Sequence, residues 1–368
     1  MREVLAEVQS WRKQGKQIAI ATNVRRDGTS LRPLGAKMAV TNTQPQEISG
    51  SVTGGCIEGV VYEEAQAVIK NGSPKLLRYG IVSEETPWEV GLTCGSSLEV
   101  FVESLESDGW REIFSAVENC LETNELAAVA TVISGPGLGR KLMCWPDGRR
   151  LGGMGSPELD AQVQAWVLGQ LAVQEDTWAA FAVGAEKVEV FVDVFVPAAR
   201  LIVVGAVHIA IPLVALAKIL GYYTIVIDPR SAFATAERFP ASLVDELLHE
   251  WPSTALERLH LDAGTYVAVL SHDEKLDNPA LKVALTSPAR YVGVLGTRKK
   301  LPQRYAALRE LGVTDEQISR LRAPIGMNLG AVLPDEIALS ILSEMVSARH
   351  GLPMTQEHHL TLPVSAVS

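Results

Sequence analysis

The order in which apolar and polar positions alternate changes once along the chain, near Pro197. Before this point, short apolar runs of strand length are mixed with helical periodicities, which predicts a mixed α/β domain over residues 1–196. The expected strands lie at 18–24, 36–40, 76–82, 98–103, 127–133 and 188–196, and the expected helices at 1–16, 60–69, 108–123 and 157–173.

After Pro197, strands and helices alternate regularly, which predicts a parallel sheet with helices on both faces. The expected strands lie at 201–204, 224–227, 243–247, 266–269 and 291–295, and the expected helices at 209–220, 256–259, 279–285, 301–311, 314–321 and 334–349. The predicted fold class is therefore α/β, with a Rossmann-like, doubly wound domain over 197–350 after the mixed first domain. The weakly patterned tail, 351–368, is expected to be flexible.

The first domain contains an internal similarity. The apolar, strand-like run at 127–133 is similar to the run at 18–24, and GRKLM at 139–143 matches GAKM at 35–38. This pattern predicts a duplication with copies at 1–107 and 108–175, although a similarity this loose can also arise by chance. The second copy has no cysteine where the first has Cys56, so we interpret it as a structural duplicate.

A glycine-rich loop precedes the helix expected at 60–69. It carries Gly54, Gly55, Cys56 and Glu58 within the sequence GSVTGGCIEG. Unpaired amides and the positive end of a helix dipole attract anions and lower the pKa of a thiol. A tight turn with a buried cysteine is the alternative interpretation.

Composition restricts the classes of function. The 368 residues are 47% hydrophobic and 21% charged, and the net charge of −10 argues against broad nucleic-acid binding. The N-terminus does not have the pattern of a signal peptide, and the longest apolar run, 209–220, is too short to span a membrane. We therefore expect a cytoplasmic protein.

Cysteine and histidine spacing gives no metal signature. The four cysteines, Cys56, Cys94, Cys120 and Cys144, form no CxxC pair, which suits a reducing compartment. The seven histidines include no HExxH pair, so no metal site built from protein ligands alone is expected. Cys94, followed by Gly95, is a second glycine-flanked thiol.

Residues 200–228 have the layout of a dinucleotide-binding unit. A strand leads into Gly205, a helix follows, and a second strand ends at Asp228, where a partner of the ribose hydroxyls belongs. Val207, however, replaces the second glycine of the fingerprint, and its branched side chain would obstruct a pyrophosphate. The fold is well supported by this pattern, whereas tight NAD(P) binding is not.

Polar residues follow several of the predicted parallel strands, at the edge where ligands bind in such sheets. They are His208, Asp228, Arg230, Ser271, His272, Asp273, Gly296, Thr297 and Arg298. Each taken singly is explained by a solvated loop or a helix cap, but their coincidence at one edge favours a ligand site. His208 and His272 are the candidate proton donors if the domain transfers hydride.

Several motifs in a fixed order make the chain similar to a known family. They are GAKMAV (35–40), GSVTGGCIEG (50–59), GLTCG (91–95), EVFVE (99–103), VVGAVHIA (203–210), DPR (228–230), SHDEKLDNPAL (271–281), GVLGTRKK (293–300) and APIGMNLGAVLPDEIALSI (323–341). With these motifs the chain resembles the XdhC/CoxI family. Its members are accessory proteins that mature molybdenum hydroxylases such as xanthine dehydrogenase and carbon monoxide dehydrogenase.

The resemblance implies a chaperone without turnover of its own. It would bind the molybdenum cofactor, as molybdopterin or its dinucleotide form, protect it during sulfuration and deliver it to a hydroxylase apoenzyme. The resemblance further implies a cysteine desulfurase as a partner and a homo-oligomeric state. Cys56 would contact molybdenum or relay sulfur, with Cys94 second. The implied cofactor-binding residues are Gly54, Gly55, Cys56, Glu58, Cys94, Gly95, Gly205, His208, Asp228, Arg230, His272, Gly296 and Arg298.

The chain departs from the family pattern at Val207, Ser96 and Asn328, where glycine, glycine and aspartate are usual, and at 30–32. These changes argue against binding of a nucleotide tail on the cofactor, whereas the Cys56 loop keeps the family pattern. Two other functions remain open. One is an NAD(P)-dependent oxidoreductase, which Val207 disfavours, and the other is a structural remnant that only docks on a partner enzyme.

Overall fold

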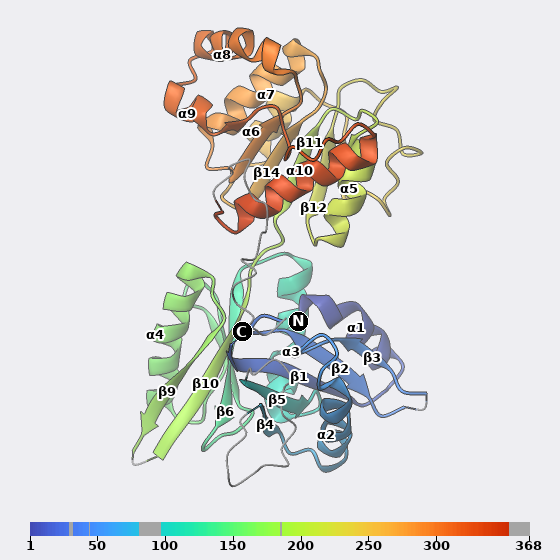
Figure 1. Cartoon of the computed structure of the whole chain (residues 1–368). Helices are drawn as coiled ribbons and strands as arrows, with labels where there is room; N and C mark the ends of the chain where they lie inside the picture. Colours follow the sequence, from blue (N-terminus) through green and yellow to red (C-terminus); the bar gives the residue numbers. More distant parts are fainter. Residues whose placement is uncertain (29–31, 44, 81–96, 185, 353–368) are drawn as a thin grey trace, which may run out of the picture. The chain divides into compact units, whose positions relative to one another are not determined.

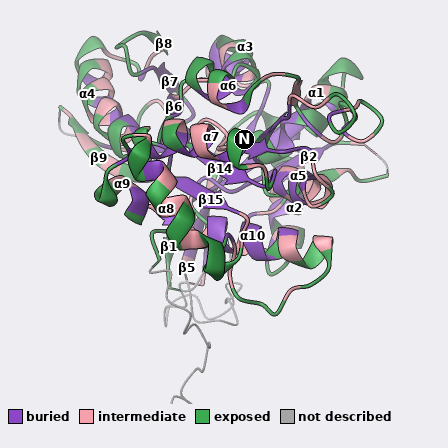
Figure 2. Cartoon of the chain, turned by 90° about the horizontal axis from the view of Figure 1, so that it is seen from above, coloured by how far each residue is buried: buried purple, intermediate pink, exposed green. Residues whose placement is uncertain are grey.

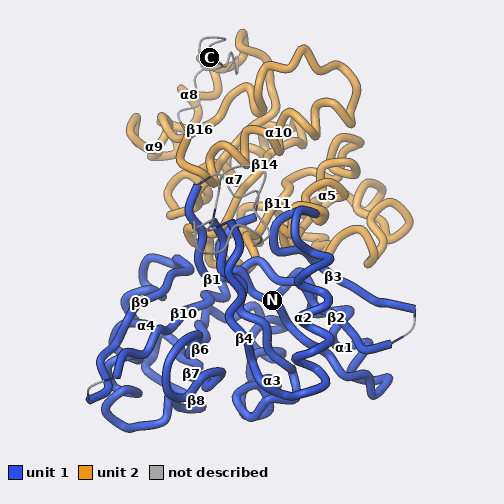
Figure 3. The backbone as a smooth tube through the Cα atoms, turned by 60° about the horizontal axis from the view of Figure 1, so that its bottom comes forward, with its two compact units in different colours: residues 1–197 blue, residues 198–368 orange. Residues whose placement is uncertain are grey.

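The computed structural model describes residues 1–28, 32–43, 45–80, 97–184 and 186–352. The chain divides into two compact units, Met1–Pro197 and Ala198–Ser368, drawn in two colours in Figure 3. Cys94, Gly95 and Ser96 lie outside the described residues, as does most of the tail predicted to be flexible.

The first half of the first unit is an antiparallel sheet with the strand order β3-β2-β1-β5-β4. Its strands are β1 (Ile18–Asp27), β2 (Lys37–Thr41), β3 (Ile48–Gly50), β4 (Lys75–Tyr79) and β5 (Ser97–Ser104). Helix α2 (Glu58–Asn71) buries one apolar face against this sheet, and its end is marked by Gly72 in the left-handed conformation. A short 3₁₀ turn, η1 (Arg2–Val4), leads into helix α1 (Leu5–Lys13).

The second half repeats this architecture with the order β8-β7-β6-β10-β9. Its strands are β6 (Ala127–Ser134), β7 (Lys141–Cys144), β8 (Arg150–Gly152), β9 (Thr177–Val183) and β10 (Glu186–Phe195). Helix α4 (Pro157–Val173) covers one face of this sheet, as α2 does in the first half (Figure 1). The two sheets therefore share one topology, and the second copy extends to Phe195 instead of ending at 175.

Register relates the two copies residue by residue. Met38 pairs with Gly50 in the first sheet, and Leu142 pairs with Gly152 in the second. A Cβ atom on either glycine would lie within 2.4 Å of a backbone oxygen of the neighbouring strand. Helices α1 and α3 (Asp108–Glu122) contribute to one apolar cluster that receives residues from both sheets. Because this core is shared, the two copies form a single unit.

The second unit is a parallel sheet with the order β13-β12-β11-β14-β15-β16. Its strands are β11 (Arg200–Val204), β12 (Tyr223–Ile227), β13 (Glu246–Leu248), β14 (Thr265–Val269), β15 (Tyr291–Val294) and β16 (Leu321–Arg322). The chain turns back at β11, which makes the sheet doubly wound. The predicted α/β class with a Rossmann-like second domain is confirmed.

Helices cover both faces of the parallel sheet. On one face lie α5 (Ala210–Ile219) and α10 (Pro334–Arg349). On the other face lie α6 (Pro252–Arg258), α7 (Glu274–Thr286), α8 (Leu301–Glu310) and α9 (Asp315–Ser319), with η2 (Arg298–Lys300) before α8. The strands of this sheet are mostly buried, while the helices expose their outer sides (Figure 2).

Several observed elements differ from the prediction, and α7, β13 and β9 are examples. Helix α7 starts at Glu274 instead of 279, because Asp273 caps it and Pro279 is accommodated within the helix. Strand β13 begins at Glu246, three residues later than expected, because Val244 is buried in the apolar cluster ahead of the strand. Strand β9 was not predicted, because its small and apolar residues carry no charged alternation.

Candidate functional site

The Cys56 loop connects β3 to α2 in the first unit. Gly54 and Gly55 adopt φ values of +100° and +123°, which glycine tolerates and other residues avoid. With these two residues in place, the backbone from Thr53 to Ile57 turns its amides inward. The loop is therefore a concave array of N–H donors at the start of a helix, as the sequence predicts.

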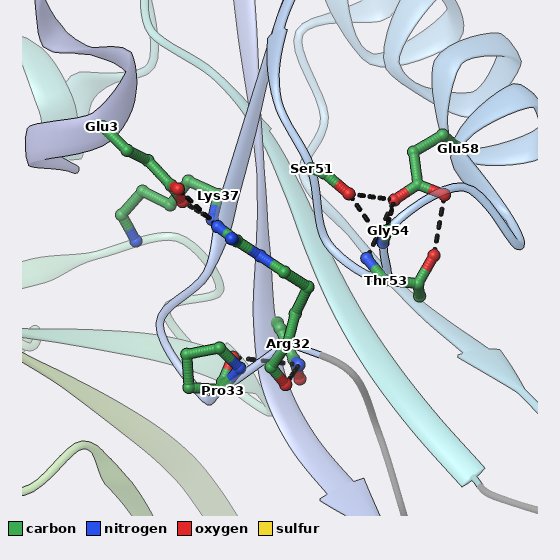
Figure 4. A network of polar contacts seen from close by, with 9 residues as sticks. Glu3, Arg32, Pro33, Lys37, Ser51, Thr53, Gly54 and Glu58 are labelled. Carbon is green, nitrogen blue, oxygen red and sulfur yellow. Dashed lines mark hydrogen bonds and ion pairs between the residues drawn. The ribbon is translucent and has the colours of Figure 1, made fainter. Parts of the chain in front are cut away.

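The interior of this array is occupied by the carboxylate of Glu58, the first residue of α2 (Figure 4). Its Oε1 accepts hydrogen bonds from the Thr53 and Gly54 amides at 2.8 and 3.0 Å. Its Oε2 accepts from the Gly55 and Ile57 amides at 2.9 and 3.2 Å. The hydroxyls of Ser51 and Thr53 donate to the same carboxylate at 2.5 and 2.7 Å.

This environment favours the charged form of Glu58. Partial burial acts to raise its pKa, but the hydrogen bonds from Ser51, Thr53 and the loop amides outweigh burial and lower the pKa to about 2. The anion predicted at this loop is thus a side chain of the protein itself. Because Gly54 and Gly55 donate to Glu58, their amides already have a partner in this structure, and their contact with a cofactor stays a prediction.

Cys56 lies on the outside of this loop. Its amide donates to Thr53 Oγ1 at 3.1 Å, and its side chain is exposed, which excludes the alternative of a tight turn around a buried cysteine. Cys120 and Cys144 are buried, and burial raises the pKa of each thiol to about 11. Among the cysteines that the structure describes, Cys56 is the one that a bulky partner can reach.

In the second unit, the turn after β11 is held close to the end of β14. Gly205 has φ of +103°, and a Cβ atom on it would lie 2.7 Å from the backbone of Ser271. Only glycine allows this approach. Val207 is partly buried and packs against the apolar cluster that includes α5 and α10.

Asp228, at the end of β12, is fully buried and surrounded by donors. Its carboxylate accepts from the Ala206 amide at 2.8 Å, from the Arg230 amide at 3.0 Å and from Arg230 Nε and Nη2 at 2.9 and 2.7 Å. Burial acts to raise the pKa of Asp228, but the bonds from Arg230 and Ala206 outweigh it and lower the pKa. The carboxylate predicted to contact a ribose therefore has hydrogen-bond partners within the protein, Ala206 and Arg230.

Three other residues predicted at this edge, His208, His272 and Arg298, have exposed side chains. Gly296 is partly buried. His272 has φ of +60°, an uncommon conformation for a residue with a side chain. Strands β11 and β14 are neighbours, so the turns that carry His208 and His272 leave the same edge of the sheet.

A buried polar pair supports the His272 turn. Ser271 Oγ donates to Asp277 Oδ1 at 2.6 Å, and Arg304 Nη2 lies 3.2 Å from Asp277 Oδ2. Burial raises the pKa of Asp277 despite these partners. Sequence patterns did not single out Asp277 or Arg304. The expected helix began only at 279, so position 277 was not recognised as part of the buried face of α7, where a carboxylate is tolerated only with a partner.

Metal-ligating side chains do not gather in the described part of the chain. Within it, no group of three or more His, Cys, Asp or Glu side chains is placed to hold a metal ion. None of the helices in the described ranges combines the length and apolarity needed to cross a bilayer.

Comparison with known proteins identifies the family. Residues 201–345 match the family model described as the XdhC Rossmann domain. Residues 11–80 match the model described as the XdhC and CoxI family. Together the two matches span more than half of the 368 residues. The chain belongs to the XdhC and CoxI family. The family resemblance inferred from the sequence motifs is confirmed.

Curated relatives of this family member come from two bacteria. The molybdenum cofactor insertion chaperone PaoD of Escherichia coli K12 is 28% identical over 353 residues, which cover 96% of this chain and 88% of PaoD. A probable xanthine dehydrogenase subunit of Bacillus subtilis 168 is 25% identical over 342 residues, which cover 91% of this chain and 94% of that protein. The uncharacterised protein YqeB of E. coli K12 is 34% identical, but the match covers only 32% of its length.

A solved structure shares the fold. The crystal structure of a xanthine dehydrogenase from Bacillus halodurans superimposes with a TM-score of 0.75 at 22% identity. The match covers 94% of this chain and 96% of the other. At this identity the likeness concerns the fold alone.

Proposed function

We propose that this chain binds the molybdenum cofactor, protects it while its sulfur ligand is installed and delivers it to a molybdenum hydroxylase of the xanthine dehydrogenase or carbon monoxide dehydrogenase type. Membership of the family and similarity to PaoD over nearly the whole chain support this proposal. The cofactor is cargo, so the chain needs a site that holds and releases it without turnover. A cysteine desulfurase is the class of partner that would supply the sulfur.

The observation that carries the proposal is the exposed thiol of Cys56 on a rigidly held loop. Six hydrogen bonds to Glu58 fix the backbone on both sides of Cys56. A thiolate is the form of cysteine that binds metals and accepts sulfur, and an exposed position lets it meet a bulky cargo. We place the contact with the cargo at the Cys56 side chain, not at the loop amides, because those amides already hold Glu58.

Anaerobic purification after production in a host that makes the cofactor tests this role. Molybdenum by mass spectrometry and pterin by fluorescence are quantified per chain for the unaltered protein and for Cys56→Ser. We expect the substitution to remove most of both and to abolish activation of a hydroxylase apoenzyme. Cys120→Ser is the matched control, because its hydroxyl can replace the thiol that donates to the Glu125 carbonyl at 3.0 Å. Undiminished cargo in Cys56→Ser would remove the proposal.

The oxidoreductase alternative receives less support. A dinucleotide-type sheet is present, but the acidic residue expected to hold the ribose hydroxyls, Asp228, is buried and engaged by Ala206 and Arg230. A dehydrogenase would bind NADH saturably. In the presence of a substrate it would oxidise NADH, and the absorbance of NADH would decrease. The chaperone is expected to show cargo retention without such a reaction.

A further inference from the structure

The carboxylate of Asp228 has no capacity left for a ligand. A carboxylate offers about four lone-pair positions. Those of Asp228 face the Ala206 amide, the Arg230 amide, Arg230 Nε and Arg230 Nη2. A ribose diol that approached this position would meet donors where it needs an acceptor.

Arg230, which supplies three of these four donors, lies close to a second arginine, Arg238. The Cζ atom of Arg230 lies 4.3 Å from the centre of the Phe233 ring, and the Cζ atom of Arg238 lies 5.9 Å from the same ring. Arg238 Nη1 donates to the Ala206 carbonyl at 2.9 Å and to the Phe233 carbonyl at 2.5 Å. Both guanidinium groups are therefore oriented before any ligand arrives, so binding would cost little side-chain entropy.

Several donors of this pair remain available. Within the described residues, Nη1 of Arg230 and both Nε and Nη2 of Arg238 have no hydrogen-bond partner. Arg230 is neutralised by Asp228, and Arg304 faces Asp277, the other buried carboxylate near this edge. Arg238 forms no ion pair with a described residue, so the corner keeps a positive charge beside the exposed ring of Phe233.

The position of this corner in the fold points to a ligand site. Ala206 belongs to the turn after β11, and Asp228 follows the neighbouring strand β12, so both lie at the carboxyl edge of the sheet. Ligands of doubly wound sheets bind along this edge. A guanidinium pair with free donors matches the tetrahedral oxygens of a phosphate better than it matches a neutral diol.

We propose that this corner, formed by Ala206, Asp228, Arg230, Phe233 and Arg238, binds a phosphomonoester and rejects an unphosphorylated ribose diol. A phosphomonoester could be the extra phosphate of a nucleotide or the phosphate end of a pterin. The natural ligand rests on the proposed function, which favours the pterin, whereas the preference for phosphate rests on the corner alone.

Matched ligand pairs test the proposal in the full chain purified without cofactor. One pair is NADPH and NADH, which differ by a ribose phosphate. The other is 6-hydroxymethylpterin monophosphate and the same pterin without phosphate. We expect calorimetry to show the phosphorylated member binding at least about tenfold more tightly in one or both pairs, since guanidinium–phosphate bonds are charge-assisted. The pair with the larger ratio identifies the source of the phosphate.

Variants connect this ratio to the corner. Arg238→Gln removes one cation without unpairing Asp228, and Asp228→Asn combined with Arg230→Gln removes the other without leaving a buried charge. Each is expected to bring the affinity ratio close to one, whereas Arg290→Gln should preserve it. Arg290 is a suitable control because it is exposed and precedes β15, at the opposite edge of the sheet.

Two results would overturn the proposal. The first is a phosphorylated ligand that binds no better than its partner in either pair, including the case in which no binding is detected. The second is a ratio that persists in both variants. Since these titrations contain no molybdenum, their failure would leave the cargo measurement with Cys56→Ser unaffected, and the reverse also holds.

Discussion

The ammonium of Lys37, on β2 of the first copy, lies 2.7 Å from a carboxylate oxygen of Asp193, on β10 of the second copy. The reciprocal pair joins Lys141 on β7 to Glu103 on β5, also at 2.7 Å. Each lysine is almost completely buried. Each copy thus supplies a lysine from its second strand and receives a carboxylate from the last strand of the other copy.

We predict that replacing one partner of such a buried ion pair lowers the unfolding free energy more than replacing both partners. Lys37→Met would leave the carboxylate of Asp193 buried and unpaired, at a cost of about 3–5 kcal/mol in unfolding free energy. Lys37→Met combined with Asp193→Leu should recover a large part of that loss. Urea unfolding of the single and double variants measures the difference. Lys75→Met is the control, because Lys75 pairs with Glu64 at the surface and should cost at most about 1 kcal/mol. A double variant no more stable than Lys37→Met would contradict the prediction.

A pH dependence follows from Asp176, which lies beside this pair. Burial and the charge of Asp193 raise the pKa of Asp176 from 3.8 to about 7. The native state therefore holds a proton between about pH 4 and 7 that the unfolded state has released. The contribution of Asp176 to the free energy of unfolding is therefore fully present below about pH 4 and is lost as the pH rises through about 7.

Asp176→Asn isolates that contribution. In the unaltered protein the Val194 amide donates to Asp176 Oδ1 at 2.7 Å. The side-chain oxygen of an asparagine can still accept this hydrogen bond, but the asparagine cannot ionise. We expect the variant to gain stability relative to the unaltered protein as the pH increases from 5 to 8, in urea unfolding measured at each pH. Glu175→Gln, an exposed neighbour, should show no such trend. Parallel curves for Asp176→Asn and the unaltered protein would refute the assignment.

Glu58 should act as the resident anion of the Cys56 loop. Glu58→Ala is expected to lower the unfolding free energy by about 1–3 kcal/mol, because the amides that faced the carboxylate lose their partner. The vacated array should then bind an external anion, so molybdate or sulfate should raise the melting temperature of the variant more than that of the unaltered protein. Glu63→Ala, which removes an exposed carboxylate from the same helix, is the control. Equal anion effects on Glu58→Ala and Glu63→Ala would contradict this role.

Local sequence patterns predicted much of the fold but little of the polar geometry. The doubly wound sheet follows from strand–helix alternation, and the duplicated topology was visible in the match between GAKM and GRKLM. The exchange of Lys37 and Lys141 between copies was not predictable, because each partner is distant along the chain. The hydrogen bonds from Ser51 and Thr53 to Glu58 were not predictable either, because their spacings of seven and five residues do not match the three-residue spacing of a capping box. The donors around Asp228 were not predictable, because sequence spacing locates a carboxylate but does not show how many hydrogen bonds it accepts.

The close approach of Gly205 to the backbone of Ser271 predicts a strong effect of any side chain at position 205. Gly205→Ala would place a Cβ atom 2.7 Å from the backbone of Ser271 and force a left-handed conformation on alanine. Gly221→Ala is the matched control, because Gly221 has φ of +77° with no atom within 4 Å of its Cβ position. The conformational cost, about 1–2 kcal/mol, is common to both, so the difference in unfolding free energy measures the steric clash alone. We expect Gly205→Ala to be the less stable by about a further 1–3 kcal/mol, the cost of overpacking. Hydrogen exchange should locate the loss at the ends of β11 and β14, and equal stabilities would show that the two turns can separate freely.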